Sequence, residues 1–413
     1  MKLSHNQQIK VTLGCENFLE NHLDLVRGKR VGLITNPTGV DSKLQSLIDL
    51  FSKHPSIDLV ALYGPEHGLR GHAHAGEYVP FYLHEKYNLP VFSLYGQSLT
   101  PDTGTLRDRD AHMRAFDTVV EGKFPERSMI ESVDVLVFDI QDVGTRIYTY
   151  VATMAYCMQV CAEFGLEFIV LDRPNPINGK DLEGPILEYP EFSSFVGLYP
   201  IPVRHGMTIG ELAQLFNNQF LTRSANLKVI PMLDWKRKFW FDQLSIPWTA
   251  PSPNMPTLQT ATVYPGQVFL EGTNLSEGRG TKKPFELFGV PWIDGIFLEK
   301  ELNQLLLPGV KFRREQFMPT FSKYQGELCE GIQIQVIDRN TYKPFRVALH
   351  VIKAIKERHP EQFLFHAKYF DKIMGTASVR QAIEKGERIE KIMKGYGSQL
   401  DEFAKLRKDY LLY

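Results

Sequence analysis

The sequence predicts an α/β protein in which a mostly parallel sheet, covered by helices on both faces, precedes a smaller α+β domain. Three observations lead to this prediction. Apolar runs of strand length alternate with helical patterns through the first half of the chain. Near-continuous apolar strands are typical of parallel sheets that are buried on both faces. The 413 residues exceed one ordinary domain, and the regular alternation of apolar strands and helical patterns ends near residue 230.

The strands expected in the first domain follow one another regularly. Residues 30–36 and 58–63 form the first two strands, and a helical pattern over residues 42–54 separates them. Residues 89–96, 134–140 and 167–172 form the third, fourth and fifth. A long apolar helix is expected between the last two, over residues 147–164. Alternation of this kind favours a parallel sheet.

The first domain is expected to span residues 1–232 and the second to span residues 233–413. Residues 247–256 hold four prolines, which indicates an ordered, extended crossing segment. Helical patterns and short strands, such as residues 331–337, follow it. The segment EGTNLSEGRGT, residues 271–281, is rich in glycine and is expected to fold back over the first domain. A surface loop is the alternative interpretation of that segment.

Composition argues against several classes of protein. The net charge is −1, so no strong overall field attracts nucleic acid or an anionic membrane. The chain has no apolar run of about 18 residues, so no membrane span is expected. No signal peptide is visible, which predicts a cytoplasmic protein as given, or a secreted one if a signal was trimmed. The four cysteines have no zinc spacing and suggest no disulfide framework.

Polar residues follow all five strands expected in the first domain. Because the carboxyl ends of parallel strands share one edge, and ligands bind in the crevice outside that edge, we expect these residues to form one cleft. They are Asn36, the pair Glu66 and His67, Tyr95, the group Asp139, Gln141 and Asp142, and the group Asp172, Arg173 and Asn175.

The stretch LYGPEHGLRGHAHAGE, residues 62–77, permits several interpretations. Its histidines and Glu77 suit zinc or iron, although no HExxH helix supports a metal site. Its glycines fit no phosphate-loop spacing. A turn with solvated charges is a third interpretation. The fourth is a catalytic carboxyl, because Glu66 directly follows a buried strand, where partial desolvation raises a carboxyl pKa as a general acid requires.

The segment VFDIQDVGTRIYTY holds two further carboxylates, Asp139 and Asp142. One of them is expected to face Glu66 across the cleft, although Asp142 also suits a helix cap. Arg146 is unusual, because a cation is disfavoured at a helix N-terminus. A ligand anion or Asp139 is expected to compensate its charge.

The segments LDRPNP and EGTNLSEGRGT carry the remaining candidates. Asp172 and Arg173 either pair to shape their loop or contact substrate. Asn175 offers an amide of the kind that binds sugar hydroxyls. Nearby tyrosines are either core residues or a stacking platform for a sugar ring: Tyr63, Tyr95, Tyr148, Tyr150 and Tyr264.

Five motifs in order, GLITNPTGV, LYGPEHGLRG, VFDIQDVGTRIYTY, LDRPNP and EGTNLSEGRGT, resemble the NamZ-type exo-β-N-acetylmuramidases, long classed as a domain family of unknown function. The resemblance runs from about residue 12 to the C-terminal residues of the chain. It implies a Rossmann-like first domain, a smaller second domain and an active site in the cleft. It also implies release of N-acetylmuramic acid (MurNAc) from the non-reducing end of peptidoglycan fragments, without a metal or nucleotide cofactor.

The resemblance assigns the catalytic acid to Glu66. We expect Asp142, Asp139 or Glu277 to act as nucleophile, base or stabiliser, because glycosidases generally need a pair of carboxyl groups. An arginine is expected to bind the lactyl carboxylate of MurNAc, since a guanidinium matches a carboxylate. The candidates are Arg70, Arg146 and Arg279. The other expected substrate contacts are Asn36, His67, His72, Gln141, Asn175 and Asn274.

Two alternatives remain open. One is a metal-dependent hydrolase built on His67, His72, His74 and Glu77. The other is a non-catalytic protein that binds muropeptides in the same cleft. In each case the expected partner is a small molecule, such as a MurNAc-containing disaccharide or muropeptide, rather than nucleic acid or a membrane.

Overall fold

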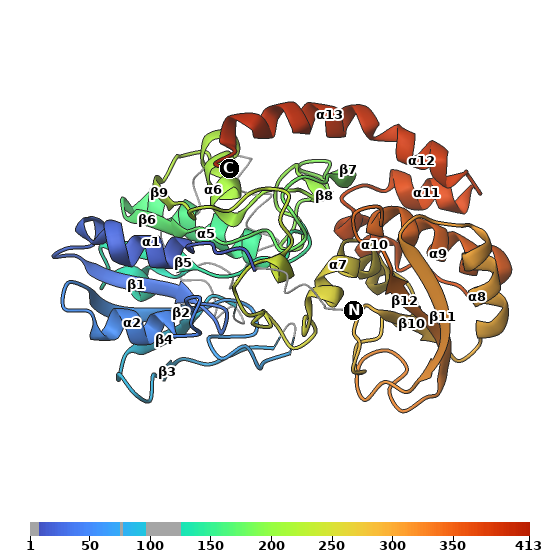
Figure 1. Cartoon of the computed structure of the whole chain (residues 1–413), viewed down its shortest axis with the longest axis horizontal. Coiled ribbons are helices and arrows are strands. Elements are labelled where there is room, and N and C mark those ends of the chain that lie inside the picture. The colour runs from blue at the N-terminus through green and yellow to red at the C-terminus, as the bar shows by residue number, and fades with distance from the viewer. Residues whose placement is uncertain (1–7, 75–76, 96–124) are drawn as a thin grey trace, which may run out of the picture.

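The computed structural model describes residues 8–74, 77–95 and 125–413, and its largest element is a seven-stranded sheet (Figure 1). The strand order is β3-β4-β2-β1-β5-β6-β9. All neighbours are parallel except β3 and β4. The strands are β1 (Arg30–Thr35), β2 (Asp58–Gly64), β3 (Tyr82–Leu83), β4 (Pro90–Ser93), β5 (Val135–Asp139), β6 (Glu167–Leu171) and β9 (Asn226–Ile230).

The chain builds this sheet outward in two directions. It runs from β1 through β2 to β4, and then returns to the other side of β1 with β5, β6 and β9. This is the Rossmann-type order, and its topological switch point lies between β1 and β5. A parallel sheet of this kind places the carboxyl ends of its strands at one edge, so residues after β2, β4 and β5 meet there.

Helices cover both faces of the sheet, as the apolar strands require. On one face, α1 (Gly14–Asn21) and α2 (Leu47–Lys53) pack against residues such as Val31 and Val135. On the other face, α5 (Tyr150–Phe164) and α6 (Ile209–Gln219) pack against residues such as Leu136 and Phe168. All four of these strand residues are fully buried. Two smaller elements lie in the same half: the antiparallel pair β7 (Glu183–Ile186) and β8 (Pro202–Arg204), and α4 (Arg127–Ile130).

The second part of the chain is an α+β unit with a three-stranded antiparallel sheet of order β10-β12-β11. The predicted fold class is confirmed. The unit's strands are β10 (Leu287–Val290), β11 (Val310–Phe317) and β12 (Cys329–Val336). Its helices are α7 (Leu258–Gln267), α8 (Gly295–Gln304), α9 (Pro344–Arg358), α10 (Ala367–Met374), α11 (Ser378–Glu384), α12 (Ile389–Gly395) and α13 (Gly397–Leu406).

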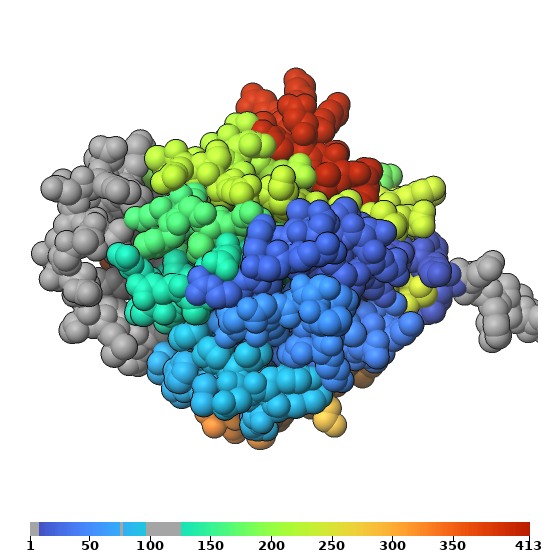
Figure 2. Space-filling model, turned by 90° about the vertical axis from the view of Figure 1, so that its left-hand side faces the viewer, coloured from blue at the N-terminus to red at the C-terminus, as the bar shows by residue number. Residues whose placement is uncertain are grey.

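The end of the chain returns to the first part. Helix α13 runs back over the molecule, and the C-terminal residues reach the neighbourhood of α6 (Figure 1). They lie above the N-terminal half of the chain in Figure 2. The Tyr413 hydroxyl donates to Asp172 Oδ2 at 2.7 Å and accepts from the Met232 amide at 2.7 Å. The chain therefore passes between its two parts twice.

The boundary at residues 232 and 233 stays a prediction. Trp235, Phe241, Leu244 and Ile246 pack in the same core as β1. The segment after β9 is therefore continuous with the first part for some distance.

Several predicted elements differ in extent from the observed ones. The helix expected over residues 147–164 begins at Tyr150, because the preceding residues form the turn that leaves β5. The helix expected over residues 42–54 covers only Leu47–Lys53. The strand expected over residues 89–96 is β4, which ends at Ser93. Among the helices of the described ranges, none has the length and apolar character needed to cross a membrane.

Candidate active site

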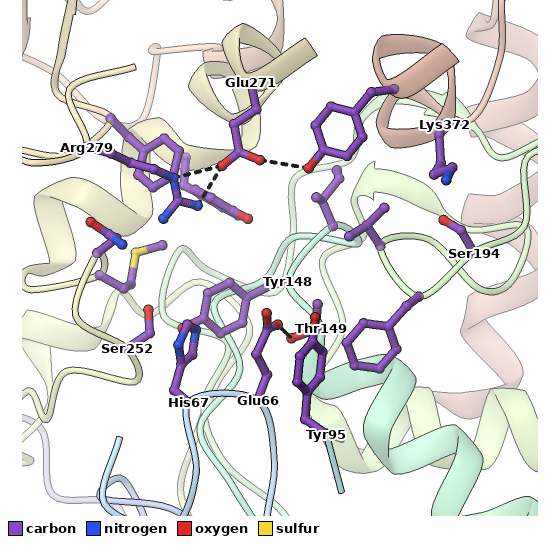
Figure 3. A pocket seen from close by; sticks show the side chains of 18 residues that line it. Glu66, His67, Tyr95, Tyr148, Thr149, Ser194, Ser252, Glu271, Arg279 and Lys372 are labelled. Atoms are coloured by element: carbon purple, nitrogen blue, oxygen red, sulfur yellow. Dashed lines mark hydrogen bonds and ion pairs between the residues drawn. The ribbon is translucent and has the colours of Figure 1, made fainter. Parts of the chain in front are cut away.

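A cavity of about 370 Å³ lies between the carboxyl edge of the large sheet and the second part of the chain (Figure 3). The first part supplies residues that follow β2, β4 and β5. The second part supplies residues from α7, from the segment after it, and from α10. The cavity is lined by Glu66, His67, Tyr95, Ile147, Tyr148, Thr149, Ser194, Phe195, Val196, Ser252, Asn254, Met255, Tyr264, Glu271, Arg279, Phe285, Tyr369 and Lys372.

Glu66 lies in the wall formed by the large sheet, between Tyr148 and Tyr95 in Figure 3. Its side chain retains 8% exposure. Oε2 accepts a hydrogen bond of 2.7 Å from the Thr149 hydroxyl, at the start of α5. The loop after β2 is tight: a Cβ on Gly64 would lie 2.5 Å from the Leu69 amide nitrogen. This packing directs Glu66 into the cavity.

His67 is held in one orientation and one tautomer. Its φ of 72° is uncommon for a residue other than glycine, so the loop imposes this backbone shape. Nδ1 lies 2.8 Å from the Ala73 carbonyl oxygen. A carbonyl only accepts, so Nδ1 carries the proton, and in the neutral ring Nε2 keeps a lone pair. Burial lowers the pKa of His67 although the charge of Glu66 opposes this shift, so the neutral form prevails at neutral pH.

The opposite wall carries an ion pair. Arg279 donates to Glu271 Oε1 from Nη2 at 2.6 Å and from Nε at 3.2 Å. The Tyr369 hydroxyl donates to Glu271 Oε2 at 3.0 Å. Glu277 is 2% exposed, does not line the cavity, and lies between Lys323 at 3.1 Å and Arg279 at 3.4 Å. Of the described residues that line the cavity, the carboxylates are Glu66 and Glu271.

Asp139 and Asp142 lie beneath the cavity and do not line it. Asp139 forms a buried bidentate pair with Arg173, at 2.6 and 2.7 Å. Burial raises the pKa of Asp139, and the positive charge of Arg173 acts against that rise. Asp142 accepts from the Gly144 amide at 2.7 Å and lies 3.5 Å from His205 Nε2. Asp142 therefore shapes the turn that leads from β5 to α5, whereas Asp139 ties the end of β5 to the loop after β6.

The four amide side chains that were expected to contact substrate bond to the protein instead, and none lines the cavity. Their hydrogen bonds all join atoms of the protein. They run from the Thr38 amide to Asn36 Oδ1 (2.9 Å), from Gln141 Nε2 to the Asp142 and Pro174 carbonyls (2.7 Å each), from Asn175 Nδ2 to the Met207 carbonyl (2.9 Å), and from Asn274 Nδ2 to the Gln362 carbonyl (2.8 Å).

Two of the three candidate arginines lie outside the cavity. Arg70 is exposed and pairs with Glu85 at 2.5 Å. Arg146 is buried, and burial lowers its pKa to about 9. The expected compensation of Arg146 by Asp139 is wrong, because Arg146 donates to backbone carbonyls and α10 presents the negative end of its dipole to it. These carbonyls belong to Pro185, Ile201, Ile373 and Met374, at 3.0, 2.7, 3.2 and 2.7 Å.

The remaining candidate metal ligands of the histidine-rich loop face outward. His72, His74 and Glu77 are exposed, and the His74 ring lies 5.1 Å from that of Phe321. Within residues 8–74, 77–95 and 125–413, no cluster of three or more His, Cys, Asp or Glu side chains could hold a metal ion.

Several cavity residues carried no sequence signal. Tyr369 and Lys372 come from α10, far along the chain, and no motif marks them. Ser252 and Asn254 belong to the proline-rich crossing segment. Glu271 opens the motif EGTNLSEGRGT, and its place in that motif is the one signal that could have identified it. Of the five tyrosines considered as a stacking platform, Tyr95, Tyr148 and Tyr264 line the cavity, whereas Tyr63 and Tyr150 are core residues.

Comparisons with known proteins agree on one family. Residues 31–119 and 111–259 match the family described as exo-beta-N-acetylmuramidase NamZ, N-terminal, and residues 262–413 match its C-terminal counterpart. The chain is 49% identical over 405 residues to the peptidoglycan beta-N-acetylmuramidase NamZ of Bacillus subtilis (strain 168), covering 98% of this chain and 92% of that protein.

Two crystal structures of DUF1343 family proteins from Bacteroides fragilis NCTC 9343 are also similar. One has a TM-score of 0.86 and 36% identity, covering 98% of this chain and all of that one. The other has a TM-score of 0.74 and 27% identity, covering 98% of this chain and 99% of that one. The matches span both parts of the fold and the walls of the cavity, and the chain therefore belongs to the NamZ exo-β-N-acetylmuramidase family.

Proposed function

We propose that this protein is a glycoside hydrolase that releases terminal, non-reducing, β-linked MurNAc from peptidoglycan fragments in cell-wall turnover or recycling. Its similarity to the Bacillus subtilis enzyme supports the reaction class. The observation that carries the proposal is Glu66, a carboxyl group in the wall of a cavity large enough for a sugar ring. The substrate is accordingly a small MurNAc-containing fragment, and the compartment stays a prediction.

Glu66 suits the role of general acid. An acid that protonates the glycosidic oxygen must reach the substrate and be protected from bulk water. The Thr149 hydroxyl bonds one oxygen of Glu66, which fixes the carboxyl group and directs it at the cavity. His67 is neutral, so it places no fixed positive charge beside Glu66.

The second carboxylate is best supplied by Glu271. Asp142, Asp139 and Glu277 were predicted for this role, but each lies outside the cavity lining. Glu271 lines the wall opposite Glu66 (Figure 3), and Arg279 forms an ion pair with it. An ionised carboxylate there stabilises an oxocarbenium-like transition state as nucleophile, base or counter-charge. A separation of ~5–5.5 Å indicates a retaining reaction and ~6.5–9.5 Å an inverting one.

The test is Glu66→Gln, assayed with MurNAc-GlcNAc, because a sugar leaving group needs the proton that an activated aryl leaving group does not. Loss of the acid is expected to lower kcat by roughly 10²- to 10⁴-fold. Glu77→Gln is the matched control, because Glu77 is an exposed glutamate that follows the same strand. It is expected to keep full activity. Full turnover by Glu66→Gln would contradict the assignment of the acid.

A companion assay compares MurNAc-GlcNAc with GlcNAc-MurNAc. Only the first disaccharide presents MurNAc at the non-reducing end, so only it is expected to be cleaved. Metal-free protein in the presence of EDTA separates the proposal from the metal-dependent alternative, which requires that activity disappear. Binding without turnover by the unmodified protein would favour the muropeptide-binding alternative.

A further inference from the structure

The charges on the cavity walls are unequally matched. Arg279 is engaged by Glu271, through two hydrogen bonds, and it also approaches Glu277. Lys372 is the other cavity residue with a permanent positive charge. Its ammonium makes no hydrogen bond or ion pair with any residue in the described ranges 8–74, 77–95 and 125–413. The cavity therefore contains one cation that the described protein leaves without an anion.

A second unmatched group lies on the same side. Ser194 is 4% exposed, and its buried Oγ has no hydrogen-bond partner among the described residues. Ser194 and Lys372 line the same cavity, and both lie away from Glu66 in Figure 3. Buried hydroxyl groups are usually hydrogen-bonded. An ammonium and a hydroxyl without partners, on one wall, together suit a carboxylate.

The proposed substrate carries such a carboxylate. MurNAc differs from GlcNAc by a lactyl ether on O3, whereas the scissile bond is at C1. The lactyl carboxylate therefore enters the cavity to one side of the acid, where a positive charge does not disturb protonation of the leaving group. The wall that holds Lys372 and Ser194 has this relation to Glu66 (Figure 3).

We propose that Lys372, together with Ser194, binds the lactyl carboxylate and makes the enzyme prefer MurNAc over GlcNAc. This inference rests on the proposed function. The arginines suit this role less well. Arg70 pairs with Glu85 on the outside, Arg146 is buried among carbonyl groups, and Arg279 is neutralised. Lys372 is exposed, and its ammonium has no partner among the described residues. A ligand carboxylate can therefore bind it without breaking an existing ion pair.

The decisive experiment removes the positive charge of Lys372 and the negative charge of the lactyl group separately. Lys372→Met is assayed with three chromogenic β-glycosides: MurNAc, MurNAc with its lactyl carboxylate converted to the carboxamide, and GlcNAc. The unmodified enzyme is expected to favour the carboxylate over the carboxamide by about 10-fold in kcat/KM, a modest factor because the pair is only partly desolvated. Lys372→Met is expected to lower kcat/KM for the carboxylate substrate by about the same factor and to leave the other two unchanged.

Two further variants define the effect. Lys368→Met is the matched control, because Lys368 is an exposed lysine of α10 that does not line the cavity, and it is expected to behave as the unmodified enzyme. Lys372→Arg keeps the charge and is expected to retain most of the preference. An equal loss on all three substrates would show a structural role for Lys372, and an undiminished preference in Lys372→Met would show that another group binds the carboxylate.

A failure of the proposed function has a different signature. In that case the unmodified protein turns over none of the three glycosides. Calorimetric titration with free MurNAc and free GlcNAc then tests Lys372 directly. A roughly 10-fold preference for MurNAc that disappears in Lys372→Met supports the carboxylate site, and a preference that persists overturns it.

Discussion

The polar residues at the carboxyl edge of the large sheet form two layers that look alike in sequence and differ in what they contact. The upper layer, with Glu66, His67 and Thr149, lines the cavity. The lower layer, with Asp139, Gln141 and Asp172, does not line the cavity and forms its hydrogen bonds with the protein. Both layers contain carboxylates and hydrogen-bonding side chains, so residue type does not separate them.

The difference is whether each side chain is exposed to the cavity. Both oxygens of Asp139 accept from Arg173, and Asp139 has no exposed surface. Glu66 accepts from Thr149 and retains some surface in the cavity. A polar side chain whose bonds are filled by the protein shapes a loop, whereas one that faces the cavity is placed to meet a ligand. Mutations in the lower layer should therefore lower stability, and mutations in the upper layer should lower activity.

The largest expected effect on stability is from Asp139→Ala in the lower layer. The change leaves Arg173 buried without its carboxylate, which is expected to lower the free energy of unfolding by about 3–5 kcal/mol. Denaturant unfolding measures this loss. Glu66→Gln, its counterpart in the upper layer, is expected to change stability by less than about 1 kcal/mol. A stable but inactive Asp139→Ala protein would contradict the division into layers.

Arg146→Met is expected to have the next largest effect. Arg146 donates to carbonyls on both sides of the junction between the two parts, including two at the end of α10. Its removal leaves buried carbonyls without donors, so a loss of about 2–4 kcal/mol is expected in denaturant unfolding. Lys372, close in sequence to those α10 carbonyls, provides the contrast, since Lys372→Met is expected to leave stability unchanged. A loss of MurNAc preference without a loss of stability in Arg146→Met would reverse the two assignments.

Asp172 in the lower layer should make stability depend on pH. Burial and the nearby charge of Glu211 raise the pKa of Asp172 to about 7, although Tyr413 and Thr208 donate to it. The unfolded chain releases this proton at about pH 4, so between about pH 4 and 7 the folded state binds the extra proton and stability falls as pH rises. Asp172→Asn is expected to remove up to about 1.4 kcal/mol per pH unit of this slope. Unfolding of both proteins at pH 5 and pH 7 measures it, and equal slopes would contradict the raised pKa.

The smallest effect is expected outside both layers. Arg70 and Glu85 form an exposed pair on the far side of the loop that carries Glu66. Exposed pairs contribute about 0–1 kcal/mol, so Arg70→Ala should lower stability by less than about 1 kcal/mol. Its kcat/KM for the MurNAc glycoside should stay at that of the unmodified protein. A selective loss of MurNAc turnover would restore Arg70 as a substrate contact.

The sequence predicted the sheet better than the cavity. Strands β1, β2, β5 and β6 were predicted because nearly every residue in them is apolar and buried. Strand β9 was missed because polar residues such as Asn226 and Lys228 interrupt its apolar pattern. The residue order also indicated which edge holds the site, since polar residues followed each strand.

The sequence could not predict how deeply each polar residue is buried, or which distant segments of the chain pack against the first part. Asp139 and Glu66 both follow apolar strands, and only the position of Arg173 shows that one of them is enclosed. The far wall depends on how α10 docks against the first part, and no local pattern encodes that contact. For this reason Glu66 and His67 were identified as cavity residues, whereas Glu271 and Lys372 were not.

The return of the chain end to α6 has a mechanical consequence. The segment after β9 ties the two parts once, and the bonds of Tyr413 to Asp172 and Met232 tie them again. The bonds of Arg146 to the carbonyls at the end of α10 join the parts a third time. Three separate attachments leave no single line about which the parts could swing, so the spacing between the walls of the cavity is held, and the last residues of the chain help to hold it.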